Sequence, residues 1–197
     1  MLGGGLPFTA PAPTLPRMPP VTLAHKLGTT PHISPLLMKA RRLGLPTGEH
    51  LEALAVARGC RYYGGGNLPA AAAVSREQLS DEELAVALLS VAAAYSPQAI
   101  RLGAALLSKE GADVPNLSRL ARMERCEVVM RHIAEAGRHF EPVNPFWPAL
   151  LAALPPTPPP KSGVLPHPTR FVAMTGLTRR GRELLTWWIR PDSAPAA

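Results

Sequence analysis

The pattern of apolar and polar positions between Ser80 and Gly137 predicts three consecutive helices. The first spans residues 80–90, where Ser80 and Glu83 have the spacing of a capping box. In that motif each side chain bonds a backbone amide that the first helical turn leaves unpaired. The apolar residues that follow run nearly all round the helix, which is typical of a buried helix.

The second helix is predicted over residues 97–109. Ser96 precedes it as an N-cap, and Pro97 occupies the first helical position, where a missing N–H costs nothing. Gly111 follows at a place where a glycine can end the helix in the left-handed conformation. We therefore expect two well-delimited helices joined by a short connection.

The third helix is predicted from Pro115 to Gly137. Its apolar residues recur at alternating steps of three and four and form one stripe; these are Leu120, Met123, Cys126, Met130 and Ile133. Charged residues fill the opposite face, and Glu127 and Arg131 have the spacing of a favourable ion pair. We expect this opposite face to be solvated.

Shorter helices flank these three. Residues 33–43 and 47–58 each begin with a capping Ser or Thr and end before a glycine. A short apolar helix with two aromatic residues is expected within 140–154, with Asn144 as its cap. The predicted fold class is mainly α, a small orthogonal helical bundle of about five to six helices with a C-terminal β-hairpin and a disordered proline-rich N-terminal tail.

Proline divides the chain, because 9 of its 24 prolines lie in residues 1–46 and 10 in residues 142–168. Such dense proline marks linkers rather than a core. The predicted organisation is a disordered basic leader (1–31), a helical domain (32–154), a polyproline spacer (155–168), a β-hairpin (169–190) and a disordered tail (191–197).

The hairpin is predicted from two β-prone runs, Arg170 to Thr175 and Glu183 to Arg190, which are rich in aromatic and β-branched residues. Arginines gather at the turn between the runs. A two-stranded hairpin is marginal in water, so one of its faces must dock on the helices or on a partner.

The net charge of +7 is uneven along the chain. Residues 1–70 carry a balance of +5, residues 71–150 of −2 and residues 151–197 of +4. Basic ends favour an acidic partner such as nucleic acid or an anionic surface. We expect a cytoplasmic protein without a membrane span, or an organellar one if residues 1–48, which contain no acidic residue, are a transit peptide.

Catalytic and metal motifs are not evident in the sequence. His132 and His139 are neighbouring histidines, but seven helical residues place them roughly 10 Å apart, which is too far for one ion. Cys60 and Cys126 are too few for a disulfide framework. We therefore expect no enzyme activity, no metal and no cofactor.

Two functions remain open, and the first is nucleic-acid binding. The helices within 80–110 weakly resemble a helix–turn–helix, which places Gln98 and Arg101 where a recognition helix contacts bases. The basic hairpin tip would then contact phosphates through Arg179, Arg180 and Arg182.

The alternative is a protein-interaction or assembly adaptor that binds no nucleic acid. Its anchors would be Trp187 and Trp188 on the hairpin, because tryptophan is favoured at interfaces, with the proline segments as spacers. Binding to nucleic acid that weakens with salt would separate the two hypotheses. The sequence does not specify the ligand, DNA or RNA, or the oligomeric state.

Overall fold

A computed structural model of the chain describes residues 20–60, 67–109, 111–171, 178–180 and 183–185. These residues form a mainly helical fold with eight α-helices, more than the five to six predicted. The helices are α1 (Leu23–Leu27), α2 (Pro35–Arg42), α3 (Gly48–Ala57), α4 (Asp81–Leu89), α5 (Pro97–Leu107), α6 (Val114–Met123), α7 (Glu127–Phe140) and α8 (Phe146–Ala153).

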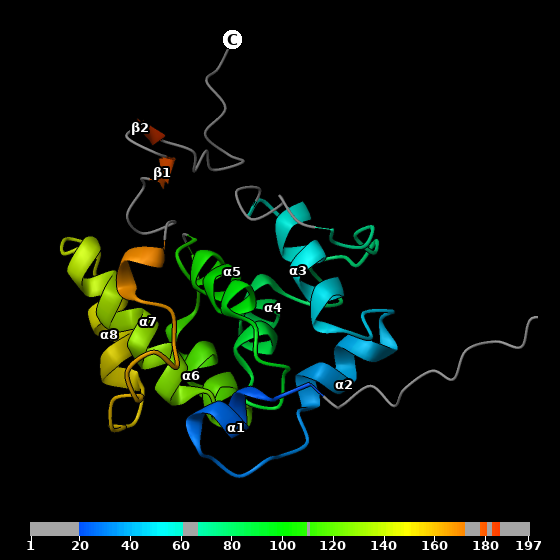
Figure 1. Ribbon diagram of the computed structural model, residues 1–197, viewed down its shortest axis with the longest axis horizontal. Helices are drawn as coiled ribbons and strands as arrows, with labels where there is room; N and C mark the ends of the chain where they lie inside the picture. The colour runs from blue at the N-terminus through cyan, green and yellow to red at the C-terminus, as the bar shows by residue number, and fades with distance from the viewer. Residues whose placement is uncertain (1–19, 61–66, 110, 172–177, 181–182, 186–197) are drawn as a thin grey trace, which may run out of the picture.

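The centre of the fold is the pair formed by α4 and α5, which pack more extensively on each other than any other two helices of the described chain. Every residue of α4 from Leu84 to Leu89 is buried, as the nearly all-round apolar pattern predicted. Figure 1 shows α4 and α5 side by side, with α3 beside them and with α6, α7 and α8 on the other side.

Several predicted helix starts are confirmed atom by atom. The hydroxyl of Ser80 accepts from the Glu83 amide while the Glu83 carboxylate accepts from the Ser80 amide, which completes the capping box. Ser34 and Ser96 cap α2 and α5 with one hydrogen bond each, because their hydroxyls accept from the amides of Leu37 and Ala99. Gly111 adopts the expected left-handed conformation at φ 83°, but α5 already ends at Leu107.

The segment 20–31, which was predicted to belong to the disordered leader, contains helix α1. Thr22 caps this helix, and Leu23 and Ala24 are buried. The Leu23 and Ala24 amides donate to carbonyl oxygens of the α4–α5 connection, on Ala93 and Val91. The prediction of disorder is therefore wrong for this part of the leader, because its two apolar side chains find a place on the core. Residues 1–19 lie outside the described part of the chain.

The predicted third helix is two helices, α6 and α7, because the backbone leaves the right-handed helical conformation at Arg125. Arg125 has φ 54°, the left-handed conformation that closes many helix C-termini. The Cys126 amide bonds back to the Ala121 carbonyl across this turn. The apolar stripe continues through the break, since Cys126 and Met130 are both buried, and this continuity made the break invisible in the periodicity.

The carboxylate of Glu124, in the turn between α6 and α7, is completely buried. It accepts from the Leu36 amide at 2.9 Å and from the Ser90 hydroxyl at 2.7 Å. Nε2 of His32 lies 3.7 Å from the same carboxylate. Glu124 was predicted to lie on a solvated face; it instead links α2, α4 and the α6–α7 turn.

Arg131 does not form the predicted ion pair with Glu127. Its guanidinium donates to carbonyl oxygens at the C-terminal end of α8, on Leu151 at 3.1 Å and on Leu154 at 3.3 Å. Arg122 also donates to a carbonyl of this helix end. The reason is that the last carbonyls of a helix have no intrahelical partner and carry partial negative charge.

The chain beyond α8 returns to the helical core. The Tyr95 hydroxyl donates to the Val164 carbonyl at 2.8 Å, and a ring nitrogen of His132 lies 2.9 Å from the Pro166 carbonyl oxygen. Phe171 is buried and contacts the His132 ring edge to face. The last part of the predicted polyproline spacer is thus packed on the helices.

The predicted β-hairpin over 169–190 is not supported. Its first strand was to begin at Arg170, but Arg170 ends a 3-10 helix, η2 (Pro168–Arg170), whose Pro at the first position favours the turn. Two three-residue segments, β1 (Thr178–Arg180) and β2 (Glu183–Leu185), pair antiparallel. The remaining residues of the predicted strands lie outside the described part of the chain.

Gly137 lies within α7 and does not end the third helix as predicted. It lies directly against the indole ring of Trp147, which is fully buried and donates from Nε1 to Glu141 at 2.6 Å. A Cβ at position 137 would overlap the ring atoms of Trp147. Glycine is therefore required here by the close approach of α8, and α7 and α8 pack together over this residue.

We predict that Gly137→Ala lowers the free energy of unfolding by about 1–3 kcal/mol, because an extra methyl group in a filled core forces neighbours apart. Urea unfolding followed by circular dichroism measures this. Gly48→Ala is the control: a Cβ there meets no atom within 4 Å, so stability should stay the same or rise slightly. Equal stability of Gly137→Ala and wild type would contradict the packing described.

Candidate functional site

The two residues predicted to contact bases, Gln98 and Arg101, lie in the first turns of α5 and are both half-buried. Eight of the eleven residues of α5 are buried. The Nε of Arg101 is buried and has no hydrogen-bond partner among the described residues. The helix is therefore a core element with little surface to offer a DNA groove.

A carboxylate from α3 occupies the N-terminal end of α5. Glu52 is 7% exposed and accepts from the hydroxyl of Ser96, the residue that caps α5, at 2.8 Å. Burial raises the pKa of Glu52; the Ser96 hydrogen bond opposes this shift, and the neighbouring Glu49 adds to it. The end of α5 thus already holds an acidic group.

This arrangement does not favour α5 as a recognition helix. The N-terminus of such a helix approaches the nucleic-acid backbone, and helix N-termini attract phosphates because of their partial positive charge. Ionised Glu52 would repel a phosphate from that position. Base contacts by Gln98 and Arg101 stay a prediction without support from their surroundings.

The C-terminal candidates are only partly placed. Arg179 and Arg180 belong to β1, with Arg179 opposite Leu184 of β2. Arg182, Trp187 and Trp188 lie outside the described residues. The described candidates therefore come from two separate elements, Gln98 and Arg101 from α5 and Arg179 and Arg180 from β1.

The densest group of charges in the described chain surrounds Asp81, the first residue of α4. Arg58 and Lys109 each approach its carboxylate at 3.0 Å, and Arg76 at 3.3 Å. Burial acts to raise the pKa of Asp81, but the hydrogen bond and charge of Lys109 and the charges of both arginines outweigh it, so this pKa is lowered. Arg58 and Lys109 also donate to backbone carbonyls, so the group is a structural clamp with no reactive atom left over.

Neither cysteine has the surroundings of a nucleophile. Cys60 is buried, and desolvation raises its pKa to about 12. Burial also raises the pKa of Cys126. Both thiols are therefore protonated at neutral pH and inert, because the thiolate is the reactive form.

Metal and membrane sites find no support in the described residues either. No three His, Cys, Asp or Glu side chains of this part of the chain gather closely enough to hold a metal ion. None of the described helices has the length and hydrophobicity that crossing a bilayer requires.

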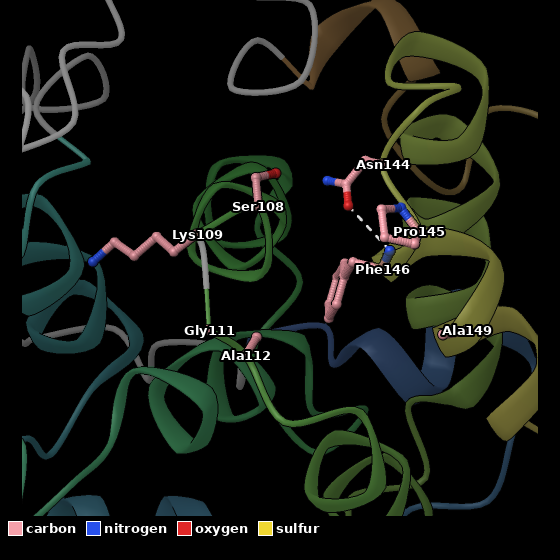
Figure 2. A pocket seen from close by; sticks show the side chains of 8 residues that line it. All are labelled: Ser108, Lys109, Gly111, Ala112, Asn144, Pro145, Phe146 and Ala149. Atoms are coloured by element: carbon pink, nitrogen blue, oxygen red, sulfur yellow. Dashed lines mark hydrogen bonds between the residues drawn. The ribbon is translucent and has the colours of Figure 1, made fainter.

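A surface hollow of about 490 Å³ lies between the end of α5 and the start of α8. Its walls are the turn that follows α5 and the first turn of α8, and they consist of Ser108, Lys109, Gly111, Ala112, Asn144, Pro145, Phe146 and Ala149. Figure 2 shows the Phe146 ring projecting into the space opposite Ser108, while Lys109 extends away from it. We call this feature the α5–α8 hollow.

The polar side chains of the α5–α8 hollow are already satisfied. The Ser108 hydroxyl donates to the Ala104 carbonyl, and the Asn144 amide joins Glu141 to the Phe146 amide. Lys109 is engaged by Asp81. What the hollow offers is apolar contact on Phe146, with no group placed for acid, base or nucleophilic chemistry.

Sequence reasoning missed the α5–α8 hollow because its walls come from segments about 35 residues apart. Of the two aromatic residues in the short helix expected within 140–154, Phe146 is half-buried and lines the hollow, whereas the adjacent Trp147 is fully buried. Val143, a large apolar residue directly before Asn144, is 94% exposed.

We predict that Glu52→Gln stabilises the protein at pH 7 by on the order of 1 kcal/mol, because it removes a charge that burial penalises. The pKa of Glu52 is higher in the folded protein than in the unfolded chain, so the folded protein binds the proton more tightly. Wild type therefore gains stability as the pH falls through the folded-state pKa towards the pKa of the unfolded chain. The advantage of the variant should therefore vanish below about pH 4. Urea unfolding at several pH values measures it, with the exposed Glu135→Gln as control. Parallel pH profiles for wild type and Glu52→Gln would be the contrary result.

In comparisons with known proteins, no protein-family model, no curated protein and no solved structure matches the chain.

Proposed function

We propose that this protein is a non-catalytic interaction or assembly protein, an adaptor whose helical unit presents apolar side chains to a protein partner. The observation that carries the proposal is the burial of α5 with Glu52 at its N-terminal end, which leaves little of that helix for sequence reading and favours the protein-interaction alternative. Trp187 and Trp188 would add a second anchor from the C-terminal end, since tryptophan is favoured at interfaces.

The use of the basic residues supports this proposal. Arg58, Arg122 and Arg131 donate to backbone carbonyls of the helical unit. Lys39 and Lys109 pair with Glu83 and Asp81. Side chains that are bound to helix ends and to carboxylates are not available to neutralise phosphates. The basic residues of the helical unit that are engaged in this way therefore stabilise the fold.

The exposed apolar residues support it as well. Four large apolar residues of the described chain are exposed: Val21, Ile33 and Met38 in the N-terminal part, and Val143, which directly precedes Asn144 of the hollow. Hydrogen bonds already satisfy the polar groups of the hollow. Burial of Phe146 and Val143 by a partner would gain roughly 25 cal/mol per Å² of apolar surface without leaving a polar group unpaired.

Nucleic-acid binding is the second candidate, in a form that does not depend on sequence. Arg125, Arg138, Lys161 and Arg170 are exposed and form no ion pair within the described residues. Together with the arginines at 179–182 they would attract phosphates. Affinity of this kind falls steeply with salt.

We predict that a photo-crosslinking amino acid at Ala149 in the α5–α8 hollow captures one discrete partner in extracts of the source cells. Ala57, exposed at the end of α3, is the matched control position and should capture none. Purified partner should then bind wild type at least tenfold more tightly than Ala149→Lys in calorimetry, whereas Ala57→Lys should behave as wild type. Equal labelling from both positions, or no loss of affinity in Ala149→Lys, would oppose the proposal.

A further inference from the structure

The N-terminal edge of the described chain has an unusual surface at α2. Ile33 is 79% exposed and Met38 is 42% exposed, and both are large apolar residues. Arg41 and Arg42 in the last turn of α2 are also exposed. We call these four residues the α2 surface.

The spacing along the helix places the four residues close to one another on the outer side of α2. Arg41 and Arg42 follow Met38 by three and four positions, which makes them its neighbours on the same face of the helix. Ile33 precedes the N-cap Ser34 and stands at the position that packs on the fourth helical residue, here Met38. The opposite face of α2 is buried through Leu36 and Ala40, so the patch points away from the core.

The patch is also held rigidly. The Leu36 amide donates to the buried carboxylate of Glu124, and the Leu37 amide donates to the Ser34 hydroxyl. On the flank of the helix, Lys39 binds Glu83 at 2.7 Å. A preformed surface loses less conformational entropy on binding, which raises the affinity it can reach.

The charge around the patch is positive and uncompensated. The chain has no acidic residue before Glu49. Arg41 and Arg42 form no ion pair within the described residues, where the one acid that pairs with α2 is bound to Lys39. The position of the two arginines at the C-terminal end of α2 is favourable for the helix dipole. That effect does not explain why Met38 and Ile33 remain exposed beside them.

The geometry points to the α2 surface as the docking site for an acidic segment of a protein partner, in which an apolar side chain is flanked by carboxylates. The apolar side chain covers Met38 and Ile33, and the carboxylates pair with the guanidinium groups of Arg41 and Arg42, which bind carboxylates in a two-pronged fashion. This inference rests on the proposed adaptor function and names a surface and a partner chemistry for it.

The mixture of residues favours a protein over the other anionic partners. Met and Arg are both enriched at the centre of protein interfaces. Nucleic-acid interfaces are more polar, and two exposed apolar side chains beside the arginines would displace water there without making a matching contact. Binding to a membrane surface needs a longer apolar face than one helix of eight residues with a single exposed apolar position provides.

The test is a selection of random twelve-residue peptides on phage against the full chain, depleted on the double variant Arg41→Glu/Arg42→Glu. We expect the enriched peptides to carry at least two acidic residues around an aromatic or aliphatic one. Fluorescence anisotropy with a labelled peptide from this set then compares variants whose fold has been checked by circular dichroism.

Wild type should bind this peptide at least tenfold more tightly than the double variant Arg41→Glu/Arg42→Glu. Its affinity should also exceed that of Met38→Gln by about threefold or more. Arg138→Glu/Lys161→Glu, which changes the net charge equally at exposed sites elsewhere, should stay within twofold of wild type. Selected peptides without acidic residues, no enriched peptides, or equal losses in the two double variants would overturn the inference.

Two further titrations identify the other occupants. The protein is titrated with vesicles containing phosphatidylserine and with duplex DNA. If either of these binds in a manner that depends on Arg41 and Arg42 while the peptides do not bind, the α2 surface belongs to that partner and the inference is overturned. Crosslinking from Ala149 is independent of α2, so a partner captured there together with a negative peptide selection would reject this surface and keep the adaptor function.

Discussion

The fully buried carboxylate of Glu124 is the contact on which the arrangement of the helices depends. It joins the amide of Leu36 at the start of α2 and the hydroxyl of Ser90 at the end of α4 to the turn between α6 and α7. Burial of a polar group is costly unless hydrogen bonds satisfy it, and leaving such a group without its partner costs roughly 1–3 kcal/mol. Each of the three segments therefore holds the other two in place.

Several features follow from this contact. The chain turns at Arg125, directly after Glu124, and α7 beyond this turn packs Gly137 against Trp147. The start of α2 is fixed on Glu124, so its outer face has a defined orientation. The same residue that organises the core thus also presents the α2 surface.

Local signals in the sequence were enough for the starts of α4 and α5, whereas α1 and the start of α7 were missed. Ser80 with Glu83, and Ser96 with Pro97, are short-range motifs, because the donor and acceptor lie within one turn. Contacts between distant residues were not predictable in this way. Glu124 occupied a position on the charged face of the predicted helix and was therefore expected to be solvated. Arg131 was paired with Glu127 because the helical periodicity contains no information on the carbonyl groups of α8, some 20 residues later.

The candidate site was less predictable than the fold. Gln98 and Arg101 had the sequence positions of base-contacting residues, but α3 brings Glu52 to the same helix end, and only the tertiary structure places that carboxylate there. The α5–α8 hollow depends on two chain segments, so no single stretch of sequence contained it. The residues of the α2 surface follow a local helical pattern, but the pattern alone did not reveal which face of α2 is buried and which is exposed.

The measurement that tests the central claim most directly is fluorescence anisotropy of labelled duplex DNA and single-stranded RNA titrated with the full chain at low and at near-physiological salt. A protein-interaction module should leave both probes unbound at near-physiological salt, with at most weak binding at low salt. Micromolar or tighter binding that persists at near-physiological salt and has a steep salt slope would contradict the account and establish phosphate contacts as the function of the basic residues.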